Sequence, residues 1–212
     1  SRCLSRREHD GCTTILVSEA NGHRLNAPND VVVKSDGSIW FSDPLYGLLN
    51  DYEGGRQRSE QPPALYRLNP GSGEVTVVAT DFDGPNGLAF SPDERLLYVA
   101  ESGAAGVPEP HRCIRVFVVG DDGRSLSGGE HFHTVRPGWA DGFRVDEQGN
   151  LWCGAADGVH CIAPDGQLIG KVLVPSRVAN LCFGDRFRSR LFLCASTRLY
   201  ALFTNTRGVE RP

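Results

Sequence analysis

One short pattern recurs along the chain and constrains its fold more than any other feature. Each copy has a polar residue, a strand-like apolar run, a turn cluster and a second strand-like run. The first three copies begin at Asn29, Asn86 and Asp141, and a fourth hairpin begins at Asn180. Units that repeat in this way bury their apolar faces against one another. The pattern therefore predicts a fold built from stacked repeats.

The spacing of the copies indicates the kind of repeat. Successive copies are about 40 to 57 residues apart, and further strand-like segments, such as 64–68 and 74–79, lie between the hairpins. Units of about 40–50 residues that hold four strands are typical of propeller blades. Amphipathic helical stretches of useful length are lacking, whereas 25 glycines and 13 prolines suit many short strands. We therefore expect an all-β chain, an incomplete propeller ring of about four blades.

The expected organisation leaves a short N-terminal segment outside these blades. Residues 25–212 account for the blades, and residues 1–24 are expected to be a remnant of a preceding blade. Within that remnant, residues 13–17 resemble an outer strand without partners. The sequence has no methionine, even at position 1, and a closed propeller needs all its blades. We therefore expect the chain to lack its beginning.

Composition excludes several classes of function. The net charge of −4 and the lack of a basic run argue against a nucleic-acid-binding surface. No apolar stretch approaches the ~18 residues of a membrane span, and nothing reads as a signal peptide. Seven cysteines form no C-x-x-C motif, so we expect buried free thiols in the cytoplasm. Cys182 and Cys194 lie on neighbouring predicted strands. The sequence does not indicate an oligomeric state.

The recurring polar residues suggest a site on the propeller axis. Asn29, Asn86 and Asp141 each precede a predicted inner strand, and inner strands converge at one face of a propeller. Their amide and carboxylate oxygens suit a hard divalent cation such as Ca²⁺, whereas matched thiolates or imidazoles for zinc are absent. These residue types also favour plain turns. Their repeated position before the inner strand, rather than within the hairpin, favours a site.

Several longer motifs resemble the gluconolactonase branch of the SMP-30/gluconolactonase/LRE family. These motifs span residues 26–44, 84–94, 140–152 and 175–200. The resemblance implies a six-bladed propeller with a divalent metal, usually calcium, on its axis. It also implies hydrolysis of a sugar lactone, with a gluconolactone-like molecule as the small-molecule substrate.

The resemblance also assigns roles to individual residues. Asn86 and Asp141 match metal ligands, and Asn29 matches the position that binds the metal or its water and the substrate. Asp141 also matches the proposed catalytic base. Ala140 replaces a proline that commonly precedes this aspartate. The family's glutamate ligand comes from the first blade, which nothing here matches, so the chain alone is expected to bind metal weakly and to have little activity.

Other sequence features have simpler interpretations. His131 and His133 are expected at the surface of an outer strand, and Trp40 and Trp152 are expected to pack between blades. Asp43 and Glu101 each follow a second strand. They are either carboxylates that support the site or caps of loops.

Three alternatives stay open at this level. The first is a broader esterase or phosphotriesterase activity at the same axial site. The second is a non-catalytic propeller that binds a ligand or a protein. The third is a truncated product without activity. Long loops at residues 44–63 and 102–112 would cover the site and set its substrate. A serine-hydrolase G-x-S-x-G motif, a P-loop and a Rossmann fingerprint are all absent.

Overall fold

The computed structural model describes residues 2–103 and 107–210. Residues 104–106 of the expected loop 102–112 lie outside the described residues. The described chain is built of β-strands, with one four-residue helix, α1 (Tyr46–Leu49). No helix in these two ranges is long and apolar enough to cross a membrane.

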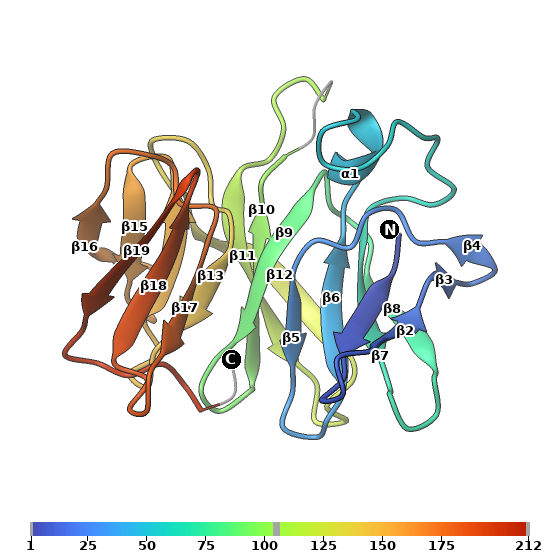
Figure 1. Cartoon of the computed structure of the whole chain (residues 1–212), viewed down its shortest axis with the longest axis horizontal. Helices are drawn as coiled ribbons and strands as arrows, with labels where there is room; N and C mark the ends of the chain where they lie inside the picture. The colour runs from blue at the N-terminus through green and yellow to red at the C-terminus, as the bar shows by residue number, and fades with distance from the viewer. Residues whose placement is uncertain (1, 104–106, 211–212) are drawn as a thin grey trace.

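Four antiparallel sheets follow one another along the chain, and we call them blades one to four (Figure 1). Within each blade the strands are hydrogen-bonded in chain order. Blade one contains β5 (Val31–Val33), β6 (Ile39–Asp43), β7 (Ala64–Leu68) and β8 (Val75–Ala79); blade two contains β9 (Pro85–Phe90), β10 (Leu96–Glu101), β11 (Cys113–Val119) and β12 (Leu126–His133); blade three contains β13 (Phe143–Val145), β14 (Leu151–Ala155), β15 (Gly158–Ile162) and β16 (Leu168–Leu173); blade four contains β17 (Asn180–Gly184), β18 (Arg190–Ala195) and β19 (Arg198–Phe203).

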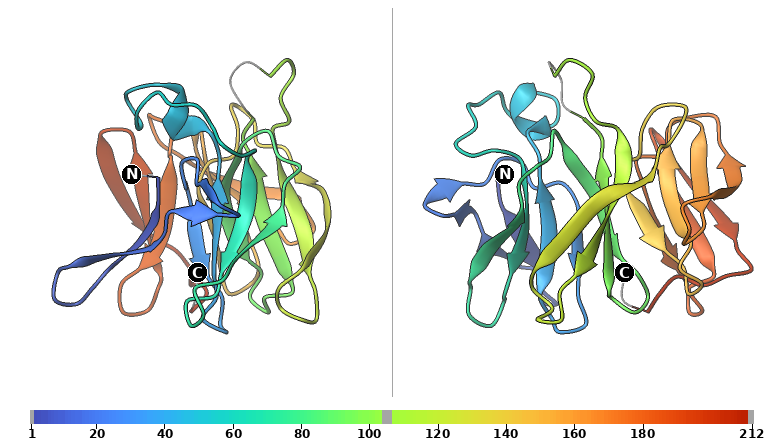
Figure 2. Two further views of the ribbon diagram at one scale, coloured as in Figure 1. Left: turned by 90° about the vertical axis from the view of Figure 1, so that its right-hand side faces the viewer. Right: turned by 180° about the vertical axis from the view of Figure 1, so that it is seen from behind.

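The blades lie side by side around a common axis, as the views from two further sides show (Figure 2). The first strand of each blade is the inner one, and β9 contacts both β5 and β13, while β13 contacts β17. A salt bridge of 3.4 Å from Arg144 Nη1 on β13 to Asp30 Oδ2, just before β5, joins blades one and three. The predicted all-β propeller of about four blades is confirmed.

Apolar side chains fill the spaces between neighbouring blades. Trp40 of blade one is fully buried and meets Phe90 of blade two edge to face, with ring centroids 5.4 Å apart. Trp152 of blade three meets Phe183 of blade four in the same way at 5.9 Å. Such edge-to-face pairs stabilise a core beyond the area that they bury. The predicted packing role of both tryptophans is confirmed.

The N-terminal residues form two small hairpins. The strands are β1 (Leu4–Arg7), β2 (Thr13–Val17), β3 (Glu19–Ala20) and β4 (His23–Arg24), and they pair as β1 with β2 and β3 with β4. The expectation that residues 13–17 lack a partner is wrong. β1 escaped notice because its sequence, Leu-Ser-Arg-Arg, is almost entirely polar. Val17 joins the core of blade one, whereas the division into a remnant and blades stays a prediction.

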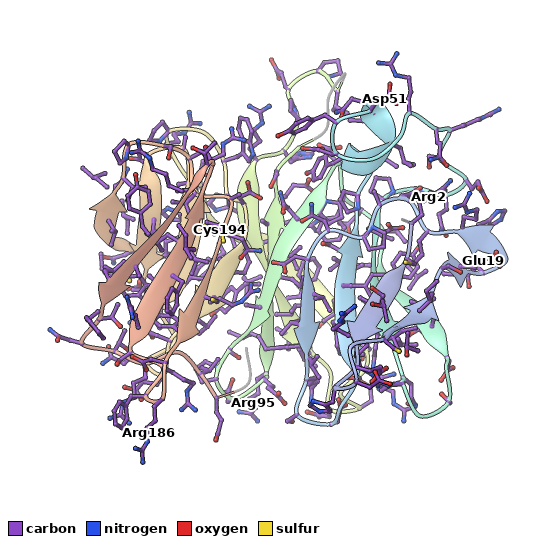
Figure 3. The ribbon with its side chains drawn as sticks, viewed as in Figure 1. Arg2, Glu19, Asp51, Arg95, Arg186 and Cys194 are labelled. Atoms are coloured by element: carbon purple, nitrogen blue, oxygen red, sulfur yellow. The ribbon has the colours of Figure 1, made fainter. Side chains whose placement is uncertain are left out.

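The cysteines are all free thiols, as predicted. The expectation of burial is correct for Cys153 and Cys161 and wrong for Cys12, Cys182 and Cys194, which are exposed. Alternate residues of a strand face opposite sides, and in β17 the buried side belongs to Leu181 rather than to Cys182. Cys194, labelled in Figure 3, lies opposite Asn180 in the β17–β18 pair and not opposite Cys182.

Candidate active site

A cavity of about 580 Å³ opens where the inner strands of the first three blades begin, beneath α1. All three predicted site residues line it. Asn29 and Asp141 precede β5 and β13 as expected, whereas Asn86 is the second residue of β9, so the expectation that it precedes its inner strand is wrong. The complete lining is Ala27, Pro28, Asn29, Tyr46, Gly47, Leu49, Glu53, Asn86, Ser102, Gly103, Arg112, Trp139, Asp141 and Arg177. Asn180, from the fourth copy of the pattern, is not part of this lining; its Oδ1 instead accepts the backbone N–H of Leu181 at 2.8 Å. Three successive blades therefore contribute oxygen-bearing side chains to one cavity.

Backbone hydrogen bonds hold Asp141 at the edge of the cavity. Its N–H donates to the carbonyl of Gly154 on β14 at 3.1 Å, and the N–H of Gly142 donates to Ala179 at 2.8 Å. Burial raises the pKa of the Asp141 carboxyl. A hydrogen bond with the Asn86 side chain opposes this rise. The site therefore keeps a half-buried carboxylate next to an amide from the preceding blade.

The environment of Asp141 contains charges of both signs. Arg177 lowers the pKa of this carboxyl, whereas the negative charges of Asp30 and Glu53 raise it. Glu53 follows α1 and lines the same cavity. The cavity thus holds a second carboxylate, from a loop rather than from an inner strand, which the sequence pattern did not reveal.

Two buried carboxylates anchor the segments that lead to the site residues. Asp43, at the end of β6, accepts the backbone N–H groups of Asn26 and Ala27, both at 2.7 Å. Glu101, at the end of β10, accepts those of Gly84 at 2.6 Å and Asp83 at 3.1 Å. Burial raises the pKa of Asp43 to about 6 and also raises that of Glu101. Of the two interpretations of these residues, the loop cap is the one that the contacts bear out.

A tryptophan and two arginines on the cavity wall were missed by the sequence analysis. The guanidinium carbon of Arg177 lies 4.2 Å from the Trp139 ring centroid, and that of Arg112 lies 4.8 Å from it. Trp139 is two residues before Asp141, and Arg177 is three residues before Asn180. The sequence signal that could have revealed Trp139 and Arg177 is their position just before two inner strands. Arg112 lies in a long loop, and nothing in the sequence places it.

The two histidines of β12 do not form a ligand pair. His131 is exposed, and its Nε2 lies 2.8 Å from Thr134 Oγ1. His133 is half-buried, with Nδ1 2.9 Å from the carbonyl of Gly166. Each ring therefore has a separate local partner, in keeping with the predicted place on an outer strand.

The lining offers oxygen donors for a hard cation. Asn29 and Asn86 each carry an amide oxygen, and Asp141 and Glu53 each carry a carboxylate. Within residues 2–103 and 107–210, His, Cys, Asp and Glu nowhere gather in the groups of three that could hold a metal ion. This donor set of amides and carboxylates fits the chemistry of Ca²⁺ better than that of Zn²⁺.

Known proteins resemble this chain in both sequence and structure. Residues 2–197 match the family described as the SMP-30/Gluconolactonase/LRE-like region. A gluconolactonase of Zymomonas mobilis is 33% identical over 209 residues, which cover 92% of this chain and 55% of the relative. A gluconolactonase structure from Xanthomonas campestris has a TM-score of 0.87 and 37% identity, covering 95% of this chain and 65% of that one.

A more distant structure shows the same fold. The calcium-binding protein regucalcin from Agrobacterium tumefaciens has a TM-score of 0.75 and 20% identity, and the match covers all of this chain and 72% of that one. The chain spans about half the length of the Zymomonas relative. The family match covers blades one to three and the first two strands of blade four, and it includes each residue of the predicted site. The chain therefore belongs to the SMP-30/gluconolactonase/LRE-like family.

Proposed function

We propose that this protein hydrolyses a sugar lactone, with a gluconolactone-like molecule as substrate, in the cavity beneath α1. The observation that carries the proposal is that Asn29, Asn86 and Asp141, from three successive blades, line that one cavity. The names of the relatives from Zymomonas and Xanthomonas support the lactone as substrate class.

We further propose that Asn29, Asn86 and Asp141 hold Ca²⁺ or another divalent cation. A bound cation of this kind supplies Lewis-acid polarisation of a carbonyl and lowers the pKa of water. Glu53 lines the cavity as well and offers a further carboxylate. It is a carboxylate of the chain itself, whereas the acidic ligand that the family resemblance implies has no match in this sequence.

In this proposal Asp141 is the general base. It accepts a proton from the attacking water, whose oxygen bonds to the lactone carbonyl carbon. The ring C–O bond then breaks, and the proton passes to the departing alkoxide, which leaves an open-chain acid. Asn86 orients the carboxylate through their hydrogen bond, and Asn29 binds a substrate oxygen.

The proposed location is the cytoplasm. All seven cysteines are free, and three of them are exposed. Exposed free thiols persist in a reducing compartment, whereas an oxidising one promotes disulfides.

A lactonase assay on the whole chain tests the function. Hydrolysis of gluconolactone is measured through the release of acid. The assay compares the chain with calcium, the chain after treatment with a chelator, and the variant Asp141→Asn with calcium. We expect chelation to abolish turnover and the variant to lose at least about 100-fold, the usual contribution of a general base. Asp165→Asn, in an exposed turn of the same blade, is the matched control.

Three results would contradict the proposal. They are turnover that chelation leaves unchanged, turnover that survives in Asp141→Asn, and no lactone hydrolysis by the unaltered chain at any calcium concentration. Faster hydrolysis of a simple ester or a phosphotriester than of any lactone would instead support the broader esterase.

A further inference from the structure

Two guanidinium groups gather on one indole ring at the wall of the cavity. Arg112 precedes β11 of blade two, whereas Trp139 and Arg177 lie in the segments that lead into the inner strands of blades three and four. Both guanidinium carbons lie within 5 Å of the Trp139 ring centroid, at 4.8 and 4.2 Å. All three side chains line the cavity that holds the proposed active site. We call Arg112, Trp139 and Arg177 the arginine–tryptophan cluster.

The contacts of another arginine show what is unusual about this cluster. Arg115 also lies over aromatic rings, 4.8 Å from the centroid of Phe82 and 5.0 Å from that of Phe117. Its guanidinium is engaged, however, because it bonds to the carboxylate of Asp81 at 2.7 Å and to the carbonyl of Gly129 at 2.8 Å. Arg115 thus has the anionic partner that a structural arginine normally has.

The arginines of the cluster are not bonded to a carboxylate in this way in the described part of the chain, although the charge of Arg177 acts on the Asp141 carboxyl across the cavity. Neither Arg112 nor Arg177 makes a side-chain hydrogen bond or a salt bridge there. Both side chains are exposed to the cavity opening. Stacking on an aromatic face restrains a guanidinium. Its N–H groups point outward in the plane of the guanidinium itself, so they stay free to donate. Two positive charges with free donors therefore face the same cavity.

We propose that the arginine–tryptophan cluster binds an anionic group of the substrate, which makes the preferred substrate an acidic sugar lactone. This inference rests on the proposed lactonase function. A guanidinium matches the oxygens of a carboxylate or a phosphate with two parallel hydrogen bonds. A neutral lactone offers hydroxyl groups but no counter-charge. The cluster thus sets specificity, whereas Asp141 and the two asparagines carry the chemistry.

Three lactones that differ at one position separate the possibilities. Gluconolactone is neutral, a glucarolactone carries a carboxylate at the far end of the sugar, and gluconolactone 6-phosphate carries a phosphate there. We expect kcat/KM to be at least about tenfold higher for one of the two acidic lactones than for gluconolactone, because charge-assisted hydrogen bonds contribute about 1.5–3 kcal/mol. The acidic lactone with the higher kcat/KM shows whether the bound anion is a carboxylate or a phosphate.

Variants then tie that preference to the cluster. Arg112→Gln should lower kcat/KM for the preferred acidic lactone about tenfold and leave the value for gluconolactone unchanged. Arg177→Gln should lower the ratio of the two values about tenfold, because the charge of Arg177 also acts on Asp141 and its loss alters turnover of both lactones. Arg190→Gln is the matched control, since Arg190 also stacks on rings, those of Phe192 and Phe203, but lies outside the cavity lining. It should alter neither value. Equal kcat/KM for neutral and acidic lactones, or a preference that survives in the double variant, would overturn the inference and leave the lactonase proposal intact.

A binding measurement keeps the inference testable without turnover. Calorimetry on the whole chain compares glucarate and gluconate 6-phosphate with gluconate, which carries only the carboxylate formed on ring opening. Tighter binding of either of the first two, lost in the double variant, would support the subsite even if no lactone were hydrolysed. Binding of all three acids with equal affinity, or binding of none, would overturn it.

Discussion

Blades one and three hold their site residues by different means. In blade one, the buried carboxylate of Asp43 bonds to the backbone N–H groups of Asn26 and Ala27, in the segment that leads to Asn29. In blade three, the second strand ends at Ala155, whose methyl side chain cannot accept a hydrogen bond. There the anchors are neutral.

The neutral anchor that distinguishes blade three is a hydroxyl, since a carbonyl of the second strand holds the site residue in both blades: the carbonyl of Ser42 accepts the N–H of Asn29 at 2.9 Å in blade one. Ser102 Oγ donates to the carbonyl of Ala140 at 2.6 Å, and the carbonyl of Gly154 accepts the N–H of Asp141. Asp141 is itself acidic and already lies near the charges of Asp30 and Glu53. Another buried carboxylate would raise its pKa further. Charged anchors thus occur where the site residue is an amide, and neutral anchors where it is an acid.

The largest expected effect comes from removing a charged anchor. Asp43→Ala leaves two backbone N–H groups without an acceptor, and each such buried group costs about 1–3 kcal/mol. We expect the free energy of unfolding, measured with urea, to fall by about 4 kcal/mol. Asp165→Ala removes an exposed aspartate that accepts one N–H group in a turn, and it should change stability little. Equal losses in the two variants would show that Asp43 is not an anchor.

The pH dependence of stability should differ between the chain and Asp43→Asn. Because burial raises the pKa of folded Asp43 to about 6 from its ordinary value of 3.8, the folded state binds more protons than the unfolded state between these values. The stabilisation from this group is complete below pH ~4 and is lost as the pH rises through about 6. Relative to Asp43→Asn, the chain should lose up to about 3 kcal/mol over that window. If the free energies of unfolding of the chain and of Asp43→Asn changed in parallel from pH 4 to 7, the raised pKa of Asp43 would be refuted.

A glycine sets how closely the inner strands of blades two and three approach each other. A Cβ at Gly87, on β9, would overlap the backbone carbonyl of Asp141. Gly87→Ala should lower the free energy of unfolding by about 2 kcal/mol, in the range for overpacked sites. It should also reduce lactonase activity, because Asp141 is displaced. Gly170→Ala meets nothing within 4 Å and serves as the control. Full activity in Gly87→Ala would show that activity does not depend on the close approach of Gly87 to Asp141.

The sequence was sufficient for the parts of the fold that repeat. Strand alternation and turn residues revealed the blades, and the repeated polar residue before each inner strand indicated Asn29, Asn86 and Asp141. Features that occur once were not predictable. β1 is polar, α1 is four residues long, and Glu53 and Arg112 reach the cavity from long loops. A loop residue's position depends on how its loop packs, which no local pattern encodes.

The smallest expected effect comes from the neutral anchor of blade three. Ser102→Ala removes one hydrogen bond, that to the carbonyl of Ala140. A single neutral hydrogen bond contributes about 1 kcal/mol net, so the urea midpoint should shift by about a quarter of the shift in Asp43→Ala. Ser125→Ala, which removes an exposed hydroxyl bonded to Asp122 in a turn, is the control and should change the midpoint less. A loss in Ser102→Ala as large as that in Asp43→Ala would remove the distinction between charged and neutral anchors.

We propose that Asn29, Asn86 and Asp141 together bind a divalent cation for lactone hydrolysis. Calorimetric titration of the chelator-treated chain with calcium, beside Asp141→Ala, is the decisive experiment. We expect saturable binding to the chain and none to the variant. Absence of binding to the chain, or binding that Asp141→Ala leaves unchanged, would contradict it.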